Sequence, residues 1–237
     1  MRLLVLAGGF GTRLKTAVNG IPKALAPVGD APFLQLQLES WLAQGVRQFT
    51  FLLHHQAEQI IDFLLAQESG PLSACKVNWL VEKKPLDTGG AIAYGVKQLG
   101  LKEDFLFANA DTWLGSGIAE LTQAQAPSMA VVKLLNVSRY GQVQFDQNKL
   151  VRSFTEKKNE SMGGWINAGM GKLEADLFLG WDGNPFSLER DLYPALVLES
   201  KLSAVPLRTD FIDIGIPEDY YHFCRWVTTG RQFPLCN

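Results

Sequence analysis

Short apolar runs and helically spaced apolar residues alternate along the first half of the chain. Apolar or aromatic runs of strand length occur at Leu3–Ala7, Gln48–Leu53, Lys76–Glu82 and Phe105–Ala108. Between these runs, apolar side chains recur at helical spacing in two segments, Leu34, Leu38, Trp41 and Leu42 followed by Ala57, Ile60, Ile61, Leu64 and Leu65. Gly45 is expected to end the first helix, and Thr88 to cap a third that runs to about Leu99.

This alternation predicts βαβ units and therefore an α/β fold with a mainly parallel central sheet and helices on both faces. In such sheets, ligands bind beyond the carboxyl ends of the strands. Three polar or glycine-rich segments follow predicted strands at that edge: Gly8–Arg13, Glu82–Gly90 and Asn109–Asp111. The sequence therefore predicts that these three segments form one site.

After about residue 126 the pattern changes to short strands with little helix between them. The predicted strands are Met129–Leu135, Gln142–Phe145, Leu150–Thr155 and Trp165–Met170. We interpret them as a small antiparallel subregion of the same domain that serves as a substrate lid. The pattern then predicts a helix at Ser187–Leu198, strands at Leu202–Pro206 and Phe211–Ile214, and a helix at Pro217–Val227. We expect a single domain over residues 1–237, whose two halves meet at about residue 126.

Composition excludes several classes of protein. A hydrophobic content of 47% with 19% charged residues supports a large core. The net charge of −2 argues against a broad nucleic-acid surface, although a few local cations suffice for a small anion. The three cysteines, Cys75, Cys224 and Cys236, form neither a disulfide framework nor a zinc pattern, so we expect a reducing cytoplasmic location. No apolar stretch is long enough to span a membrane, and the N-terminus is a poor signal peptide.

The glycine-rich segment Gly8–Leu14 is suited to binding phosphate. Glycines let backbone N–H groups approach phosphate oxygens closely, and Arg13 adds a forked cation. A second cation, Lys23, follows Pro22. The segment is not a dinucleotide-binding fingerprint, because Leu14 stands at the third glycine position, and it lacks the lysine of a Walker loop.

The glycine-rich segment followed by Pro22-Lys23 resembles the signature of the sugar-1-phosphate nucleotidyltransferases. The resemblance extends almost from end to end through further motifs: Glu82–Ala91, Asn109-Ala110-Asp111, Arg139-Tyr140-Gly141, Glu156-Lys157, Asn167-Ala168-Gly169 and Phe211–Gly215. The stretch GIPKALAPVGDAPFL and the chain length are most similar to the short members that make GDP-heptose from D-glycero-D-manno-heptose 1-phosphate. The resemblance implies a Rossmann-like, GT-A-like three-layer fold, with a nucleotide-binding half at about 1–126 and a sugar-phosphate-binding half at about 127–237. It also implies a role in nucleotide-sugar biosynthesis for lipopolysaccharide or capsule.

Two aspartates stand in apolar surroundings, which is costly for a carboxylate unless it is paired or bound to a metal. Asp111 follows an apolar run, and Asp213 lies inside the segment FIDIG. The resemblance implies that these two positions together hold Mg²⁺, the expected cofactor. Asn109-Ala110-Asp111 departs from the usual Asn-Gly-Asp of the family, which crowds the ligand slightly but keeps the carboxylate.

The implied reaction is attack of a sugar-phosphate oxygen on the α-phosphorus of a nucleoside triphosphate, with release of pyrophosphate. Arg13 and Lys23 are the expected catalytic cations. The expected nucleotide-binding residues are Leu6, Ala7, Gly8, Gly9, Gly11, Thr12, Glu82, Pro85, Thr88 and Gly89. The expected sugar-phosphate-binding residues are Asn109, Gly141, Glu156, Lys157, Asn167 and Gly169. Lys157 lies in a charge run that is also typical of a solvated face.

Several alternatives stay open. Glu82 suits the N1–H and amino group of guanine and favours GTP, but the same segment also resembles members that use uridine nucleotides. Glu189 and Arg190 either reach the sugar or pair along their helix. The apolar side of the C-terminal helix serves either core packing or a subunit contact, which leaves a homodimer open.

Three other functions compete with the main reading. They are a uridylyl- or thymidylyltransferase acting on a hexose 1-phosphate, a non-catalytic nucleotide-sugar-binding module, and a dehydrogenase, which Leu14 disfavours.

Overall fold

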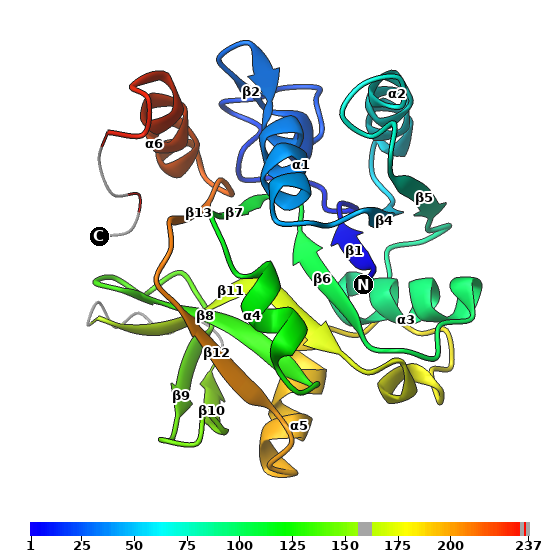
Figure 1. The fold of residues 1–237 in the computed structure, drawn as a ribbon, viewed down its shortest axis with the longest axis vertical. Coiled ribbons are helices and arrows are strands. Elements are labelled where there is room, and N and C mark those ends of the chain that lie inside the picture. Colours follow the sequence, from blue (N-terminus) through cyan, green and yellow to red (C-terminus); the bar gives the residue numbers. More distant parts are fainter. Residues whose placement is uncertain (156–162, 233–234, 236–237) are drawn as a thin grey trace.

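A computed structural model describes residues 1–155, 163–232 and 235 of the chain (Figure 1). Its main sheet is centred on four parallel strands, β1 (Leu3–Leu6), β4 (Gln48–Leu53), β5 (Lys76–Val81) and β6 (Phe105–Asn109). They lie in the order β6-β1-β4-β5, with Leu3 opposite Phe49 on one side and opposite Leu106 on the other. The four strands predicted from apolar runs are confirmed, and their carboxyl ends meet at one edge of the sheet.

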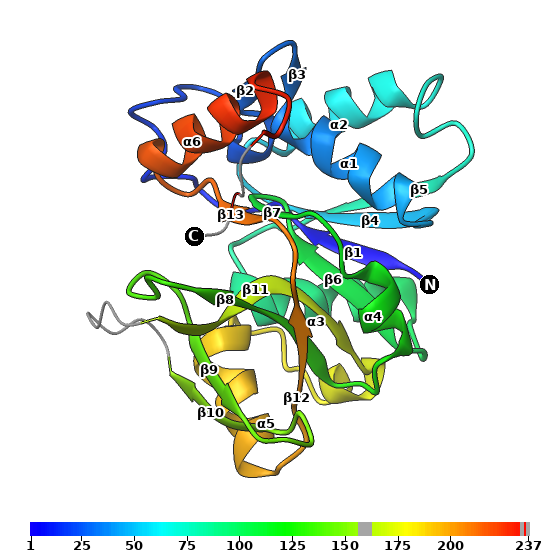
Figure 2. The same cartoon turned by 60° about the vertical axis from the view of Figure 1, so that its left-hand side comes forward.

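Alternate side chains of the central strands face opposite helical layers. Leu3 belongs to the same buried cluster as α1 (Phe33–Ala43) and α2 (Ala57–Gln67). Leu4, one residue later, packs instead with α3 (Asp87–Leu99). Figure 2 shows α1 and α2 on one side of the sheet and α3 on the other. The predicted three-layer α/β arrangement is therefore confirmed.

The antiparallel strands predicted as a subregion of the same domain are continuous with the main sheet. β11 (Gly164–Leu173) runs antiparallel to β6, and also pairs with β8 (Ser128–Leu134) and β9 (Gln142–Phe145). β10 (Val151–Thr155) pairs with β9 at one end, and β12 (Ser203–Leu207) runs parallel to β8. Because β11 pairs directly with β6, one continuous sheet joins the two halves of the chain.

A third buried cluster joins the C-terminal helix to segments near the start of the chain. It contains α6 (Pro217–Thr228) and residues of two small sheets. The small sheets are β2 (Pro27–Val28) with β3 (Ala31–Pro32), and β7 (Thr112–Leu114) with β13 (Phe211–Asp213). The Tyr220 hydroxyl donates a hydrogen bond of 2.5 Å to the Pro27 carbonyl. The apolar side of α6 therefore serves core packing, the first of the two alternatives.

The remaining elements are short. They are α4 (Ile118–Gln123), α5 (Tyr193–Leu198), 3₁₀ turns at Lys23–Leu25 and Ala175–Phe178, and a π-helical turn at Leu188–Leu192. The predicted helix at Ser187–Leu198 is thus a π-helical turn that continues into α5. Within the described residues, no helix combines the length and apolar character that crossing a bilayer needs.

Candidate active site

The segment that follows β1 is a tight loop with a buried anchor. A Cβ on Gly8 would lie 3.2 Å from the Cβ of His54, so the loop backbone packs closely on the end of β4. Gly11 has a φ of +58°, and its carbonyl accepts the N–H of Leu14 at 3.1 Å. Leu14 is buried in the same cluster as α6. The residue at the third fingerprint position is therefore a core residue, which supports the argument against a dinucleotide-binding loop.

Lys23, Asp111 and Asp213 meet beside this loop. Asp111 follows β6, and its carbonyl accepts the N–H of Ile214 at 3.0 Å. Asp213 ends β13 and lies opposite Thr112 of β7. The ammonium group of Lys23 forms an ion pair with Oδ2 of Asp111. Two aspartates from distant parts of the sequence thus lie on adjacent backbone segments, as the family resemblance implied.

A glycine makes room for this charged group. A Cβ on Gly215 would lie 2.8 Å from Oδ1 of Asp213 and 3.3 Å from Nζ of Lys23. The N–H of Gly215 donates to the same carboxylate oxygen at 2.7 Å. Any larger residue would push the lysine or the carboxylate away, so the glycine of FIDIG has a direct structural reason.

The three charges set one another's protonation. Burial would lower the pKa of Lys23, but Asp111 and Asp213 outweigh it, and the pKa lies above its usual value. Burial would raise the pKa of Asp111, but the charge and hydrogen bond of Lys23 leave that pKa lowered. The pKa of Asp213 is raised, first by burial and then by the charge of Asp111. Asp213 is therefore the carboxylate that gains most from a further cation.

A cavity of about 490 Å³ opens at the carboxyl ends of β1, β4 and β5. Seven of the predicted nucleotide-binding or sugar-side residues, the two loop glycines among them, and one predicted metal ligand line it: Leu6, Gly8, Gly9, Glu82, Pro85, Thr88, Asn109 and Asp111. Glu82 is buried, and its Oε2 accepts the N–H of Leu86 at 3.0 Å. Burial raises the pKa of Glu82 in spite of this hydrogen bond. We call this hollow the nucleotide-side cavity.

Other predicted nucleotide-binding residues lie outside that lining. Gly89 donates its N–H to the Phe186 carbonyl at 2.9 Å, and a Cβ at Gly89 would lie 2.3 Å from that ring. Its lack of a side chain is therefore explained by packing. Ala7 donates its N–H to the Leu52 carbonyl at 2.9 Å, and Thr12 is exposed.

The predicted capping role of Thr88 is wrong. Leu86 is the N-cap of α3, and no side chain caps that helix. The Thr88 hydroxyl instead donates to Glu189 at 2.8 Å and accepts the N–H of Leu188 at 2.9 Å. Glu189 also accepts the Ser187 hydroxyl at 2.9 Å. The polar partners of Thr88 come from the second half of the chain, so the start of α3 is tied to the π-helical turn.

A second cavity, of about 440 Å³, faces the antiparallel strands, and we call it the sugar-side cavity. Its lining includes the predicted residues Arg13, Thr88, Asn109, Gly141, Asn167, Gly169 and Asp213. It shares Asp87, Thr88 and Asn109 with the nucleotide-side cavity. The two hollows therefore adjoin, with the charged group of Lys23 and the two aspartates near their junction. Glu156 and Lys157 lie outside the described residues.

Three of the sugar-side residues contact one another. Gly169 has a φ of +69°, and a Cβ there would lie 2.8 Å from Nδ2 of Asn109. Its N–H donates to Oδ1 of Asn167 at 3.1 Å. The motif Asn167-Ala168-Gly169 thus forms a local turn whose glycine makes room for Asn109.

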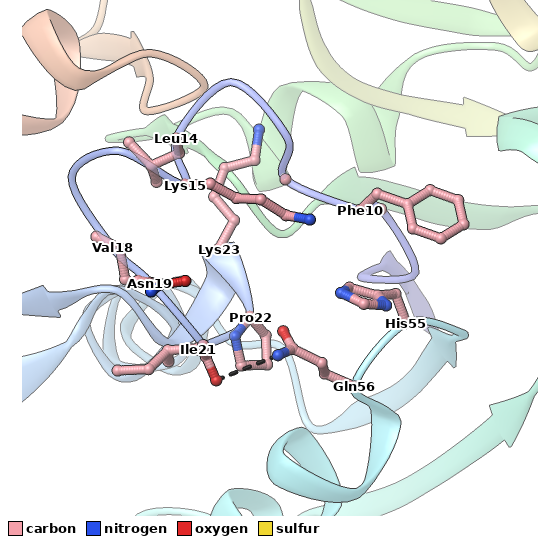
Figure 3. A pocket seen from close by; sticks show the side chains of 13 residues that line it. Phe10, Leu14, Lys15, Val18, Asn19, Ile21, Pro22, Lys23, His55 and Gln56 are labelled. Carbon is pink, nitrogen blue, oxygen red and sulfur yellow. Dashed lines mark hydrogen bonds between the residues drawn. The ribbon is translucent and has the colours of Figure 1, made fainter.

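A third hollow, of about 230 Å³, lies on the other side of the glycine loop, between that loop and the start of α2 (Figure 3). Lys15 extends into it toward Phe10 and His55. The Phe10 ring lies 5.2 Å from the His55 ring. Gln56, with a φ of +53°, donates to the Gly20 carbonyl at 3.1 Å. These contacts fasten the loop to α2.

Two structural features of the site were missed by sequence reasoning. Gln37 lies on the buried side of α1, and its Nε2 donates to the carbonyls of Thr112 at 2.8 Å and Asn109 at 3.2 Å. A glutamine among the apolar positions of that helix was the available signal. Arg190 forms an ion pair with Asp87, which has a φ of +60°. The sequence left open whether Arg190 pairs along its own helix. It pairs instead with Asp87, at the start of α3.

The nucleotidyl transferase family model matches residues 2–228 of this chain. A D-glycero-alpha-D-manno-heptose 1-phosphate guanylyltransferase of Campylobacter jejuni is 35% identical, and the match covers 94% of this chain and 98% of that protein. The catalytic subunit beta of mannose-1-phosphate guanylyltransferase from Drosophila pseudoobscura is 29% identical, with 98% of this chain and 64% of that longer protein covered.

Solved structures show the same likeness. HddC from Yersinia pseudotuberculosis, complexed with GMP-PN, has a TM-score of 0.81 and 32% identity over 95% of this chain and 99% of its own. A UDP-glucose pyrophosphorylase complexed with UDP-glucose shares the fold, with a TM-score of 0.79 at 20% identity over 97% of this chain and 99% of its own. The family match, these relatives and the paired cavities lead to one conclusion: the chain belongs to the nucleotidyl transferase family, among the sugar-1-phosphate nucleotidyltransferases.

Proposed function

We propose that this chain transfers the guanylyl group of GTP to a sugar 1-phosphate and releases pyrophosphate. The sugar we propose is D-glycero-D-manno-heptose 1-phosphate. The observation that carries the proposal is the group formed by Lys23, Asp111 and Asp213, which lies where the two cavities adjoin. The guanylyltransferase relatives support the choice of base and sugar.

Two anions must meet in this reaction, so repulsion between phosphates is the main obstacle. Lys23 lies beside the glycine loop and would place positive charge near the α-phosphate, where charge develops. Arg13 faces the sugar-side cavity and would pair with phosphate oxygens from that side. The glycines of the loop would bring backbone N–H groups to the triphosphate. Positioning and charge, without a covalent nucleophile, are the chemistry that these residues offer.

The residues present fit Mg²⁺, which is part of the proposal. Asp111 and Asp213 offer carboxylate oxygens, the ligand type that Mg²⁺ prefers. A cation there would offset the burial and the charge of Asp111, which together raise the pKa of Asp213. Among the described residues, no group of three His, Cys, Asp or Glu side chains gathers at one place, so water and substrate phosphates would complete the coordination. When bound, Mg²⁺ supplies positive charge that offsets the repulsion between the reacting phosphates.

Glu82 is the residue that we propose reads guanine. Its carboxylate lines the nucleotide-side cavity and, when ionised, accepts hydrogen bonds from N1–H and the amino group of that base. Asn109, Asn167, Gly141 and Gly169 would meet the sugar hydroxyls, because they line the other cavity. Glu156 and Lys157 stay predictions. A cytoplasmic location, where GTP is available, and supply of a nucleotide sugar for lipopolysaccharide or capsule also belong to the proposal.

The test is a pyrophosphate-release screen of GTP, UTP, dTTP and CTP against heptose, mannose and glucose 1-phosphates. We expect the highest kcat/KM with GTP and the heptose phosphate, and loss of activity in EDTA that added Mg²⁺ restores. A preference for UTP or dTTP would overturn the choice of base. Absence of release with every pair would favour a non-catalytic nucleotide-sugar-binding module.

A further inference from the structure

Arg139 lies where the sugar-side cavity meets the C-terminal helix. It lines that cavity together with Arg13 and Asp213. The loop residues Gly8 and Gly9, by contrast, line the nucleotide-side cavity. An anion bound in the sugar-side cavity near Asp213 would therefore lie next to the Arg139 side chain.

The guanidinium of Arg139 is held by contacts with residues that precede and follow Asp213 in the chain. Its Nη2 donates to Oδ2 of Asp219, in the first turn of α6, at 2.5 Å. It also donates to the Tyr140 hydroxyl at 3.3 Å, and the Tyr140 ring packs edge-on against Phe211 with ring centres 5.6 Å apart. Phe211 precedes Asp213 in the chain and Asp219 follows it. The segment that carries Asp213 thus positions Arg139.

The guanidinium of Arg139 keeps hydrogen-bond donors that these two contacts do not use. Within the described part of the chain, both of its hydrogen bonds use Nη2, so the N–H groups of Nε and Nη1 are available to a ligand. Guanidinium groups bind phosphate oxygens through such donors. Arg190 also lines the cavity, but its ion pair with Asp87 holds it at the start of α3 instead of beside Asp213.

We propose that Arg139 binds the phosphate of the sugar 1-phosphate and that Asp219 is its positioning residue. The inference rests on the proposed function and names a specific phosphate contact for that site. An arginine that only stabilised the fold would leave substrate affinity unchanged. Kinetics with each substrate varied separately distinguish the two roles.

The first experiment compares Arg139→Gln and Arg139→Lys with wild type. We expect Arg139→Gln to raise KM for the sugar 1-phosphate on the order of 10- to 100-fold, because a charge-assisted contact is lost, with KM for GTP unchanged. Arg139→Lys keeps the charge and should give a smaller rise. Arg152→Gln is the matched control, because Arg152 forms a similar ion pair with Asp146, at 2.7 Å, on the outer strand β10. Its kinetics should be those of wild type.

The second experiment tests the positioning role. Asp219→Asn keeps the guanidinium but weakens its restraint, so we expect a smaller rise in the same KM than in Arg139→Gln. Asp146→Asn removes the equivalent charge from the control pair and should leave KM unchanged. A lower melting temperature for Asp219→Asn with wild-type KM would assign Asp219 to stability alone and overturn its positioning role.

The outcomes separate this inference from the proposed function. If wild type turns over and Arg139→Gln, shown to be folded by circular dichroism, keeps the wild-type KM for the sugar 1-phosphate, the assignment of Arg139 is overturned. If wild type releases no pyrophosphate with any pair, the proposed function fails, and calorimetric titration with heptose and mannose 1-phosphates decides the inference. Weaker binding by Arg139→Gln than by wild type supports it, whereas equal binding or none overturns it.

Discussion

The ammonium group of Lys23 and the carboxylate of Asp111 form an ion pair whose side chains are only 15% and 31% exposed. The pair joins the 3₁₀ turn after the glycine loop to the end of β6. Removing two charges from water costs about as much as their attraction returns, so such a pair contributes little net stability. We therefore expect the pair to contribute to catalysis more than to stability. Substitutions should separate its effect on turnover from its effect on stability.

Lys23→Ala should slow turnover by about 10²-fold, because one preorganised cation at a developing charge contributes about 3 kcal/mol to lowering the barrier. Pyrophosphate release at saturating substrates measures this. Lys201→Ala is the control, since Lys201 pairs with Glu199 at 2.7 Å on the surface. Equal kcat values for the two variants would contradict a catalytic role for Lys23.

Asp111→Asn should reduce kcat by a factor on the order of 10² to 10³, the loss typical of one electrostatic group at the reacting atoms. The amide keeps the size of the side chain but removes the charge that faces Lys23. Isothermal titration with Mg²⁺ in the presence of GTP should show weaker metal binding. Near-normal activity and metal affinity would rule out the proposed metal role.

Gly169→Ala should lower both stability and activity. Alanine at a φ of +69° costs about 1–2 kcal/mol, and its Cβ would meet Nδ2 of Asn109 at 2.8 Å. Gly183 also has a positive φ, of +94°, but a Cβ there would meet nothing within 4 Å. Gly183→Ala should therefore lose stability alone. Thermal unfolding and kcat/KM for the sugar 1-phosphate measure the two effects, and unchanged kcat/KM in Gly169→Ala would contradict a close approach of substrate.

Gln37→Leu should destabilise the protein by about 1–3 kcal/mol, because the carbonyls of Asn109 and Thr112 lose a buried donor. For a chain of this size, the melting temperature should fall by roughly 2–4 °C per kcal/mol. Gln35→Leu is the matched change on the same helix, where the amide bonds to Glu39 at the surface. A melting temperature equal to that of Gln35→Leu would show that Gln37 does not hold the turn that carries Asp111.

The sequence predicted the central strands well, because buried parallel strands are continuous apolar runs. The predicted Gln48–Leu53 has the bounds of β4. β2 and β7 were missed, since two or three residues are too few for any period. β13 is equally short but was predicted, because apolar residues stand on both sides of its aspartate. The join between β11 and β6 was also beyond reach, because alternation shows which faces are apolar but not which strand is the neighbour.

Site residues were predictable from the sequence where their signal is local, and not where they depend on tertiary contacts. The glycine loop and Lys23 were recognisable because their signal is local. The encounter of Asp111 with Asp213 depends on pairing between β7 and β13, which no spacing encodes, and it was expected only through family resemblance. Thr88 is a favourable capping type, yet its hydroxyl bonds to Glu189, far along the chain. Tertiary contacts overrode local preference there.

Leu14, at the end of the glycine loop, packs in one cluster with Phe223 and Trp226 of α6. The glycine loop is synthesised early, but its buried residue Leu14 can pack fully only after α6 has been synthesised. A nascent chain lacking α6 would contain the strands of the nucleotide-binding half, but Leu14 would lack the apolar residues that hold the loop in place. Competence to bind nucleotide should therefore arise late in synthesis, after α6 has emerged from the exit tunnel.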